Sequence, residues 1–386
     1  MQEVLDAILE AGVARGAVPG VAATVVDRDG TVYEGAAGER AIGTGVAMTT
    51  DTVGAIFSMT KAITGAAAMQ LVERGIIDLD APASAVCEEL ADPVVLTGFD
   101  GDGQPITRPA ASEPTLRQLL THTSGFVYDI WDADMTKWYA ATGAPSLFSL
   151  QKAALRTPLA FDPGTKWEYG IGIDWAGRIV EMVSGQPLAK FFDDNLLGPL
   201  GMRDTRFVLD AGQQRRLVAA AARTPDGIAR IDFEFPTDGD FHMGGGGLYS
   251  TGPDYLRFTR MLLGGGALDG VRVLAAETVK RMGENAIGDI EVPIFVSDNP
   301  AMALTVEMFP GQIKRWGLSF VINTEPVPGG RAAGSLAWAG VHNTFYWMDP
   351  ITQLTAVLMM QLLPANDPQV LDVLLRYEQA LYAARA

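Results

Sequence analysis

A serine and a lysine three positions apart, Ser58 and Lys61, are of residue types and at a spacing that could support catalysis. In a helix, residues three positions apart lie on the same face. A serine in the first helical turn lies at the positive end of the helix dipole, which favours an anion there. Burial of a lysine one turn later lowers its pKa, so it can accept the serine proton. The pair therefore indicates nucleophilic catalysis, with an ordinary helix N-cap as the alternative for Ser58.

The same spacing occurs again at Ser149 and Lys152, so spacing alone is not specific. Ser58 follows the apolar segment 53–57 and precedes an alanine-rich helix, which predicts a buried setting. Ser149 instead opens a short segment with charged residues, where a serine is expected to act as an N-cap. The context favours Ser58 as the candidate nucleophile.

The elements that must position Ser58 are predicted from hydrophobic periodicity and turn residues. Helices are expected at 1–15, 62–75, 115–121, 146–156, 172–185 and 188–195, with a final helix in VLDVLLRYEQALYAAR. Two strands joined at Asp29-Gly30 form an expected hairpin, because such a pair between β-branched runs favours a tight turn. Further strands are expected near 245–250 and 271–274 and in SFVIN, FYWMDP and LTAVLMMQLL, and an exposed loop at 92–114.

This order of elements predicts an α/β fold of the α+β type, with an antiparallel sheet flanked by helices. Segments 1–80 and 241–386 are expected to form one α/β domain built from both termini. Residues 81–240 are expected to form an inserted, mostly helical domain. The glycine runs 244–247 and 264–266 are predicted to be turns.

Composition excludes several classes of function. The chain has 386 residues and a net charge of −17, from 46 acidic and 29 basic residues, so nucleic acid and anionic membranes are not expected partners. One cysteine, Cys87, permits no internal disulfide, and three histidines make a histidine- or thiolate-rich metal site improbable. The N-terminal segment is amphipathic and acidic rather than a secretory signal, and no apolar run is long enough to span a bilayer. We expect a cytoplasmic protein, with homo-oligomerisation left open.

Six segments found in order along the chain carry a family resemblance. They are SMTK at 58–61, LLTHTSGF at 119–126, FDPGTKWEYG at 161–170, LLGPLGMRDT at 196–205, GGGGLYSTGPDYLRF at 244–258 and WAGVHNTFYWMDP at 338–350. Over nearly its whole length the chain resembles the class C β-lactamase-like superfamily of serine hydrolases, and within it most resembles the family VIII carboxylesterases. The resemblance implies a β-lactamase/penicillin-binding-protein-like fold.

The resemblance also implies roles for three residues. Ser58 is the expected nucleophile and Lys61 its partner. Tyr169 falls at the family's tyrosine position, after the PG-x-x-x-x-Y pattern. As a phenolate, or hydrogen-bonded to Lys61, it could relay a proton to the leaving alcohol.

Residues Trp338, Ala339 and Gly340 align with the family's third motif, which is expected to be an edge strand beside the nucleophile. The backbone N–H groups of Ser58 and Val341 would then form the oxyanion hole. Trp338, Ala339 and Gly340 are also expected to bind substrate.

Other side chains near the motifs are weaker candidates. Tyr128 and His342 are candidate substrate-binding residues, and Trp131 and Trp138 could form an apolar wall, although ordinary packing is the usual fate of aromatic residues. His122, within LLTHTSGF, is expected to hold its loop by a hydrogen bond.

Two departures from the β-lactamase pattern bear on the substrate. Ile171 stands where β-lactamases place an asparagine two residues after the tyrosine, and Trp338 replaces the lysine of the third motif. The lost groups would help to hold the amide and carboxylate of a β-lactam, so their absence favours neutral esters.

The sequence therefore predicts a serine carboxylesterase (EC 3.1.1) that hydrolyses or transesterifies small to medium esters through an acyl-enzyme on Ser58, without metal or cofactor. A β-lactamase, D-aminopeptidase or acyltransferase on the same fold is the first alternative. A catalytically silent penicillin-binding-like protein is the second.

Overall fold

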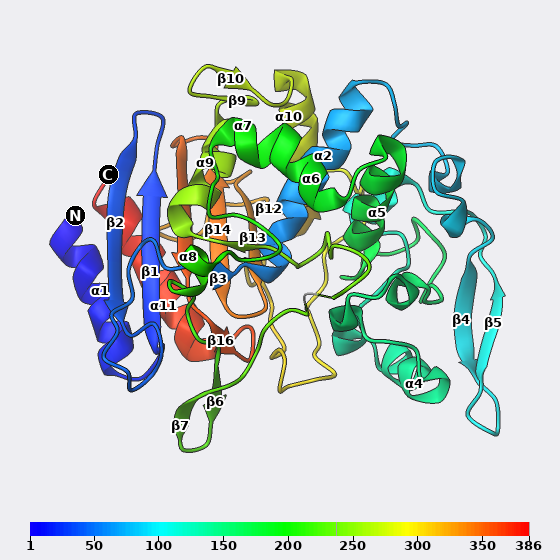
Figure 1. Ribbon diagram of the computed structural model, residues 1–386, viewed down its shortest axis with the longest axis horizontal. Coiled ribbons are helices and arrows are strands. Elements are labelled where there is room, and N and C mark those ends of the chain that lie inside the picture. The colour runs from blue at the N-terminus through cyan, green and yellow to red at the C-terminus, as the bar shows by residue number, and fades with distance from the viewer. Residues whose placement is uncertain (237, 386) are drawn as a thin grey trace.

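The computed structural model describes residues 1–236 and 238–385 and is built around a seven-stranded sheet (Figure 1). The strand order is β11-β12-β13-β14-β15-β1-β2, and every neighbouring pair is antiparallel. The strands are β1 (Gly20–Val26), β2 (Thr31–Gly38), β11 (Lys314–Trp316), β12 (Val321–Asn323), β13 (Leu336–Gly340), β14 (Thr344–Asp349) and β15 (Leu354–Met359). Since β1 pairs with β15, the N-terminal hairpin and the C-terminal strands share one sheet.

Helices cover both faces of this sheet. On one face lie α1 (Gln2–Ala14) and α11 (Pro368–Ala383), where Tyr33 of β2 donates to Asp6 and packs its ring on Tyr377. On the other face lies α9 (Gly252–Leu263), which packs against β1 and β15. Successive residues of a strand point to opposite faces, so β1 is buried along its whole length. The expected antiparallel sheet flanked by helices is confirmed.

Helix α2 (Thr60–Glu73) joins the sheet to the helical part of the molecule (Figure 1). Its composition explains its central place, because alanine, glycine and threonine allow neighbouring elements to approach closely on every side. Nearly all of its residues are buried, and it packs against α5 (Gly172–Ser184). The helix therefore holds the residues of its first turn in a fixed position at the centre of the molecule.

The segment between α2 and α9 holds short helices and peripheral hairpins. Its helices are α3 (Leu116–Leu120), α4 (Ala133–Thr142), α5, α6 (Leu188–Phe192), α7 (Gly198–Leu200) and α8 (Ala211–Gln214). Its strands are β4 (Val94–Phe99), β5 (Pro105–Pro109), β6 (Ala221–Thr224), β7 (Gly227–Arg230) and β8 (Tyr249–Ser250), and β8 pairs with β3 (Gly54–Ala55), which precedes α2. The remaining elements are β9 (Ala267–Leu268), β10 (Val271–Arg272), α10 (Ala276–Gly283) and β16 (Leu362–Leu363). Domain boundaries at residues 80 and 241 stay a prediction.

Several local expectations are wrong. Residues 146–156 form two 3-10 turns rather than a helix, because Leu150 between them adopts a left-handed conformation with φ of 53°. Ser149 therefore does not act as an N-cap, a role that the Ser146 side chain takes by accepting from the Phe148 N–H. The exposed loop expected at 92–114 contains the β4–β5 hairpin.

Among the described residues, five α-helices were not expected from the sequence: α4, α7, α8, α9 and α10. The glycine run at 244–247 forms the predicted turn, but it is also tightly packed. No helix in the part of the chain that the structure describes has the length and apolar character needed to cross a bilayer.

Candidate active site

Ser58 lies in a sharp 3-10 turn, Phe57–Met59, that leads into α2. Phe57 adopts a positive φ of 42°, which is unusual for a bulky residue and typical of strained functional turns. The rings of Phe233, Phe235 and His342 pack around Phe57 and hold it there. Met59 occupies the N-cap position of α2 without any side-chain cap bond, so the Ser58 hydroxyl does not serve as a helix cap.

Lys61, one turn later, points its amine at the Ser58 hydroxyl. The Lys61 Nζ lies 3.1 Å from the Ser58 Oγ, 2.9 Å from the Tyr128 hydroxyl and 2.6 Å from the Gly245 carbonyl oxygen, and the residue is 0% exposed. A carbonyl only accepts, whereas hydroxyls can donate or accept. A neutral amine can therefore donate to Gly245 and Tyr128 while its lone pair faces the Ser58 proton.

Burial also adjusts the proton affinity of this amine. Desolvation lowers the pKa of Lys61, and the negative charge of Asp174 partly offsets that effect. A lysine with a lowered pKa is available as a base at neutral pH, which an exposed lysine is not. The geometry and the electrostatics both suit proton transfer from Ser58 to Lys61.

Asp174 is the residue of this network that the sequence analysis missed. It lies in the first turn of α5, is 0% exposed, and its Oδ1 accepts from the Gly245 N–H at 2.8 Å. Burial raises the pKa of Asp174, while the charge of Lys61 and the Gly245 N–H lower it. Gly245 thus joins the two charged groups, since its N–H binds Asp174 and its carbonyl binds Lys61. An acidic residue on the buried face of the helix after the tyrosine motif was the only signal in the sequence.

Tyr169 lies beside Ser58, and its hydroxyl accepts a 3.1 Å hydrogen bond from Trp338 Nε1. Burial raises the pKa of Tyr169, and interactions with Ser58 and Trp338 only partly oppose that effect. A raised pKa favours the neutral phenol over the phenolate that the sequence analysis allowed. The expected hydrogen bond to Lys61 is also absent from the described residues: the amine lies over the Tyr169 ring, 4.8 Å from its centroid, and its phenol partner is Tyr128.

The third motif lies beside the nucleophile, and its residues 338–340 pair with β14 alone, although β13 as a whole is not an edge strand. Strand β13 is internal, because β12 pairs with it at Leu336 and Ala337. Trp338–Gly340 continues past that pairing and reaches the turn before Ser58. A Cβ on Gly340 would lie 2.5 Å from the Ile56 carbonyl oxygen, so only glycine permits this approach.

The expected oxyanion-hole residues both line the same cavity. Ser58 and Val341 are among its lining residues, and the Val341 N–H donates to no acceptor in the described part of the chain. An unpaired donor beside the nucleophile is what an oxyanion hole requires. The role of these two N–H groups stays a prediction.

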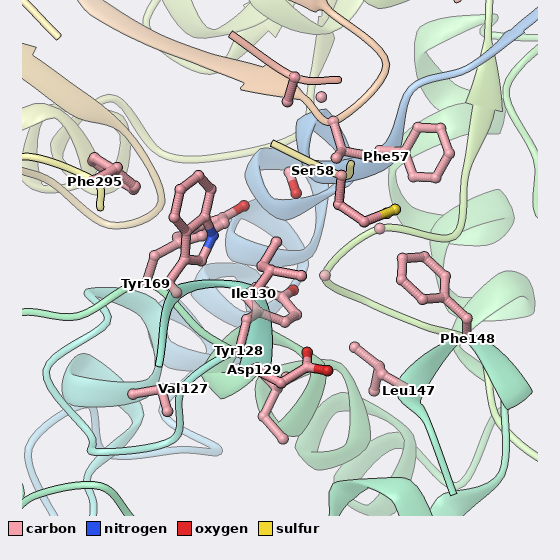
Figure 2. Close-up of a pocket in the computed structure, with 18 of the residues that line it drawn as sticks. Phe57, Ser58, Val127, Tyr128, Asp129, Ile130, Leu147, Phe148, Tyr169 and Phe295 are labelled. Carbon is pink, nitrogen blue, oxygen red and sulfur yellow. The ribbon is translucent and has the colours of Figure 1, made fainter. Parts of the chain in front are cut away.

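The cavity in front of Ser58 has a volume of about 260 Å³ and a mostly apolar wall (Figure 2). Tyr169 and Phe295 stand on one side in the view and Leu147 and Phe148 on the other, with Ile130 between them. The expected contact residues Tyr128, Trp131, Trp338, Ala339, Gly340 and Val341 all line it. The 3-10 turn Leu147–Ser149, expected to be helical, thus contributes to the pocket wall.

Three other candidates do not reach the cavity. His342 is 1% exposed behind Phe57 and bonds Gln361 through Nδ1 at 3.0 Å, so the expectation that it binds substrate is wrong. Trp138 packs on Tyr139 in a separate small cluster, away from the expected wall. His122 accepts from the Gly170 N–H through Nδ1 at 3.3 Å, which is the expected loop-holding role. Among the described residues, no group of three or more His, Cys, Asp or Glu is arranged to hold a metal ion.

Comparison with known proteins relates this site to a family. The family model described as Beta-lactamase matches residues 5–381. A lovastatin esterase from Penicillium rubens is 32% identical, over 98% of this chain and 98% of its own. A monacolin J acid methylbutanoyltransferase from Aspergillus terreus is 33% identical, over 86% of this chain and 82% of its own. The solved structure of a simvastatin synthase mutant from Aspergillus terreus matches with a TM-score of 0.87 at 28% identity, over 99% of this chain and 96% of that one.

Proposed function

This chain belongs to the beta-lactamase family of serine hydrolases and acyltransferases, and from that premise we propose that it hydrolyses carboxylic esters through an acyl-enzyme on Ser58. The single observation that carries the proposal is the 3.1 Å contact between Ser58 Oγ and the fully buried Lys61 Nζ at the floor of an apolar cavity. An activated serine within reach of a pocket is the arrangement that covalent acyl transfer needs. The finer assignment to family VIII carboxylesterases stays a prediction.

The first half-reaction acylates the serine. The Ser58 oxygen forms a bond to the ester carbonyl carbon as its proton passes to Lys61, and the carbonyl electron pair moves onto oxygen. The N–H groups of Ser58 and Val341 would stabilise that oxyanion. The bond to the alcohol oxygen then breaks, and the alcohol takes up the proton that Lys61 accepted from Ser58, while the Tyr169 phenol beside Ser58 donates a hydrogen bond to the departing oxygen.

The second half-reaction releases the acid. Water attacks the acyl carbonyl, loses a proton to Lys61, and forms a second tetrahedral intermediate in the same oxyanion site. Collapse breaks the bond to Ser58, which recovers its proton from Lys61. The residues return to their starting protonation states, so no metal or cofactor is required for the cycle.

Replacement of the nucleophile tests this function directly. The variant Ser58→Ala should lose hydrolysis of p-nitrophenyl butyrate, while Ser149→Ala, the control at the other Ser-x-x-Lys sequence, should retain it. Both proteins should show similar melting temperatures. Near-normal turnover by Ser58→Ala would refute the proposal.

Acyl transfer to an alcohol is the second candidate function, and it is favoured by the methylbutanoyltransferase at 33% identity. Transfer differs only in the second half-reaction, where an alcohol replaces water as acceptor. Product analysis with an ester donor and added alcohols distinguishes the two, because a transferase gives a new ester in excess over free acid. A predominance of free acid at saturating alcohol would favour hydrolysis.

A β-lactamase or D-aminopeptidase is the remaining alternative within the family. The Ile171 and Trp338 positions lack the amide and ammonium groups that would hold a β-lactam, which favours neutral esters. Turnover of nitrocefin or a D-alanyl amide measured beside an ester assay separates these activities. Faster turnover of either than of every ester would replace the esterase proposal.

A further inference from the structure

The substrate cavity carries an uneven charge. Among the described residues that line it, Asp129 is the only one with an ionisable acidic or basic group other than phenols. Lys61 and the buried Asp174 lie beneath the floor and do not line the cavity. The Asp129 carboxylate is therefore the charge that the cavity wall presents to a ligand.

Asp129 is held by its local backbone and not by a cation. It begins the 3-10 turn Asp129–Trp131, where its own N–H and that of Ile130 approach the carboxylate. Within the described residues Asp129 forms no salt bridge. Figure 2 shows its carboxylate beyond Tyr128, directed toward the side of the pocket where Leu147 lies.

The apolar surroundings of Asp129 strengthen the electric field of its carboxylate. The residue is half-buried, and burial raises its pKa. Burial raises the pKa of Tyr139, another lining residue, and the nearby charge of Asp129 raises it further. A charge beside apolar walls is screened less than one in open water.

We propose that Asp129 makes the cavity selective against anionic esters, so that the substrate is an apolar ester with no free carboxylate, phosphate or sulfate on the part that enters the pocket. A cationic substituent is accepted more readily than an anionic one. This inference rests on the proposed esterase function and narrows its substrate class.

Matched substrates and an isosteric variant test the proposal. The substrates are p-nitrophenyl pentanoate, the mono-p-nitrophenyl ester of glutaric acid and p-nitrophenyl 4-(trimethylammonio)butanoate, which share a leaving group and similar acyl length. The quantity measured is the ratio of kcat/KM for each charged ester to that for the pentanoate ester. Because this ratio is formed within one protein sample, it does not depend on the fraction of active enzyme.

In the wild type we expect the anionic-to-neutral ratio to be lowest and the cationic-to-neutral ratio higher. Asp129→Asn should raise the anionic ratio about tenfold and lower the cationic one, as removal of a nearby charge at intermediate dielectric predicts. The control Asp102→Asn, on the exposed β4–β5 turn, makes the same change in net charge far from the cavity and should leave both ratios unchanged. The three esters differ in intrinsic reactivity, but this difference is the same for every variant and cancels when the ratios are compared between variants.

Salt provides a second measurement on the unaltered enzyme. Raising ionic strength from about 0.02 to 0.5 M should increase the anionic ratio and decrease the cationic one, because it shortens the screening length. Ratios that do not change with Asp129→Asn or with salt, in a protein that hydrolyses the neutral ester, would overturn this inference alone. Absence of turnover with all three esters would overturn it together with the proposed function.

Discussion

The indole N–H of Trp338 donates a hydrogen bond to the phenol oxygen of Tyr169 at 3.1 Å. This contact joins two motifs that are 169 residues apart in the sequence. It also occupies an acceptor position of the phenol and leaves the phenol proton available for donation. Tyr169 can then deliver a proton toward Ser58 or the leaving alcohol, while Trp338 fixes its orientation.

Removal of the phenol hydroxyl should therefore reduce catalysis more than removal of its partner. For Tyr169→Phe we expect kcat with p-nitrophenyl butyrate to fall about 10²–10⁴-fold, the usual contribution of a proton-transfer group. For Trp338→Phe we expect a fall of about tenfold, the contribution of one hydrogen bond. Steady-state kinetics of the two variants check this order. Equal activity of Tyr169→Phe and the wild type would exclude the relay.

The position of Lys61 predicts a pH dependence. The amine must be neutral to accept the serine proton, so kcat/KM should rise with pH through the lowered pKa of Lys61 and then level off. Asp174 raises that pKa by its charge, so Asp174→Asn should move the acidic limb of the profile to lower pH. A pH series with both proteins measures the displacement. Movement of the limb to higher pH would contradict the assignment of Lys61 as the base.

A different test of the same network removes the base. Lys61→Arg keeps a positive charge that cannot be lost at accessible pH, so hydrolysis should be abolished across the pH range. The exposed Lys137, paired with Asp134 on α4, provides the control substitution Lys137→Arg, which should retain activity. Turnover by Lys61→Arg at high pH would assign the base to another residue.

Close backbone approach at Gly340 predicts a steric effect on activity. A methyl group there would meet the Ile56 carbonyl oxygen and the Thr344 hydroxyl, which would push the third-motif strand away from Ser58. Gly340→Ala should lower kcat/KM by at least about tenfold, because the oxyanion donors depend on this spacing. Gly101→Ala, at a position where a Cβ meets nothing within 4 Å, is the matched control. Comparable activity of both variants would refute the proposed spacing requirement.

Disruption of a buried ion pair away from the cavity should lower the stability of the fold without a direct effect on catalysis. The Arg331 guanidinium binds Glu378 of α11 at 2.6 Å, and both side chains are nearly inaccessible. Burial raises the pKa of Glu378, but Arg331 outweighs this effect and lowers it overall. Glu378→Gln should lower the free energy of unfolding by about 3–5 kcal/mol, because it leaves a buried charge unpaired.

Denaturant unfolding measures this change. The control is Asp194→Asn, which breaks the exposed pair with Lys190 and should lower the free energy of unfolding by about 0.5 kcal/mol or less. Because the pKa of Glu378 is lower in the folded state, its contribution is present above the unfolded value of 4.5 and is lost as pH falls through the folded value. Equal losses of unfolding free energy in Glu378→Gln and Asp194→Asn would show that the buried pair stabilises the fold no more than the exposed pair does.

Much of the fold was predictable because its signals are local. Apolar alternation and the Asp29-Gly30 turn marked the hairpin of β1 and β2, and alanine content marked α2. The helix expected at 146–156 failed because Leu150 takes a left-handed conformation that packing imposes, which no propensity signals. Helix α9 carried local signals that the sequence analysis did not use, since it has a threonine N-cap, an early proline and apolar residues at helical spacing.

The site residues that belong to sequence motifs were predictable, whereas contacts between side chains of different elements were not. Ser58, Lys61 and Tyr169 lie together as their motifs imply. Tyr128, not Tyr169, proved to be the phenol partner of Lys61, since the two hydroxyls come from different loops and only the folded chain orients them. Asp174 reaches Lys61 through Gly245, a contact that no spacing in the sequence reveals.

The central claim is that Ser58 carries the acyl group during turnover. Intact-mass spectrometry after brief mixing with a slowly hydrolysed ester, followed by peptide mapping, tests it most directly. We expect a single added acyl mass on the peptide that contains Ser58, and its disappearance on longer incubation. Turnover of the ester with no adduct, or with an adduct on another residue, would contradict it.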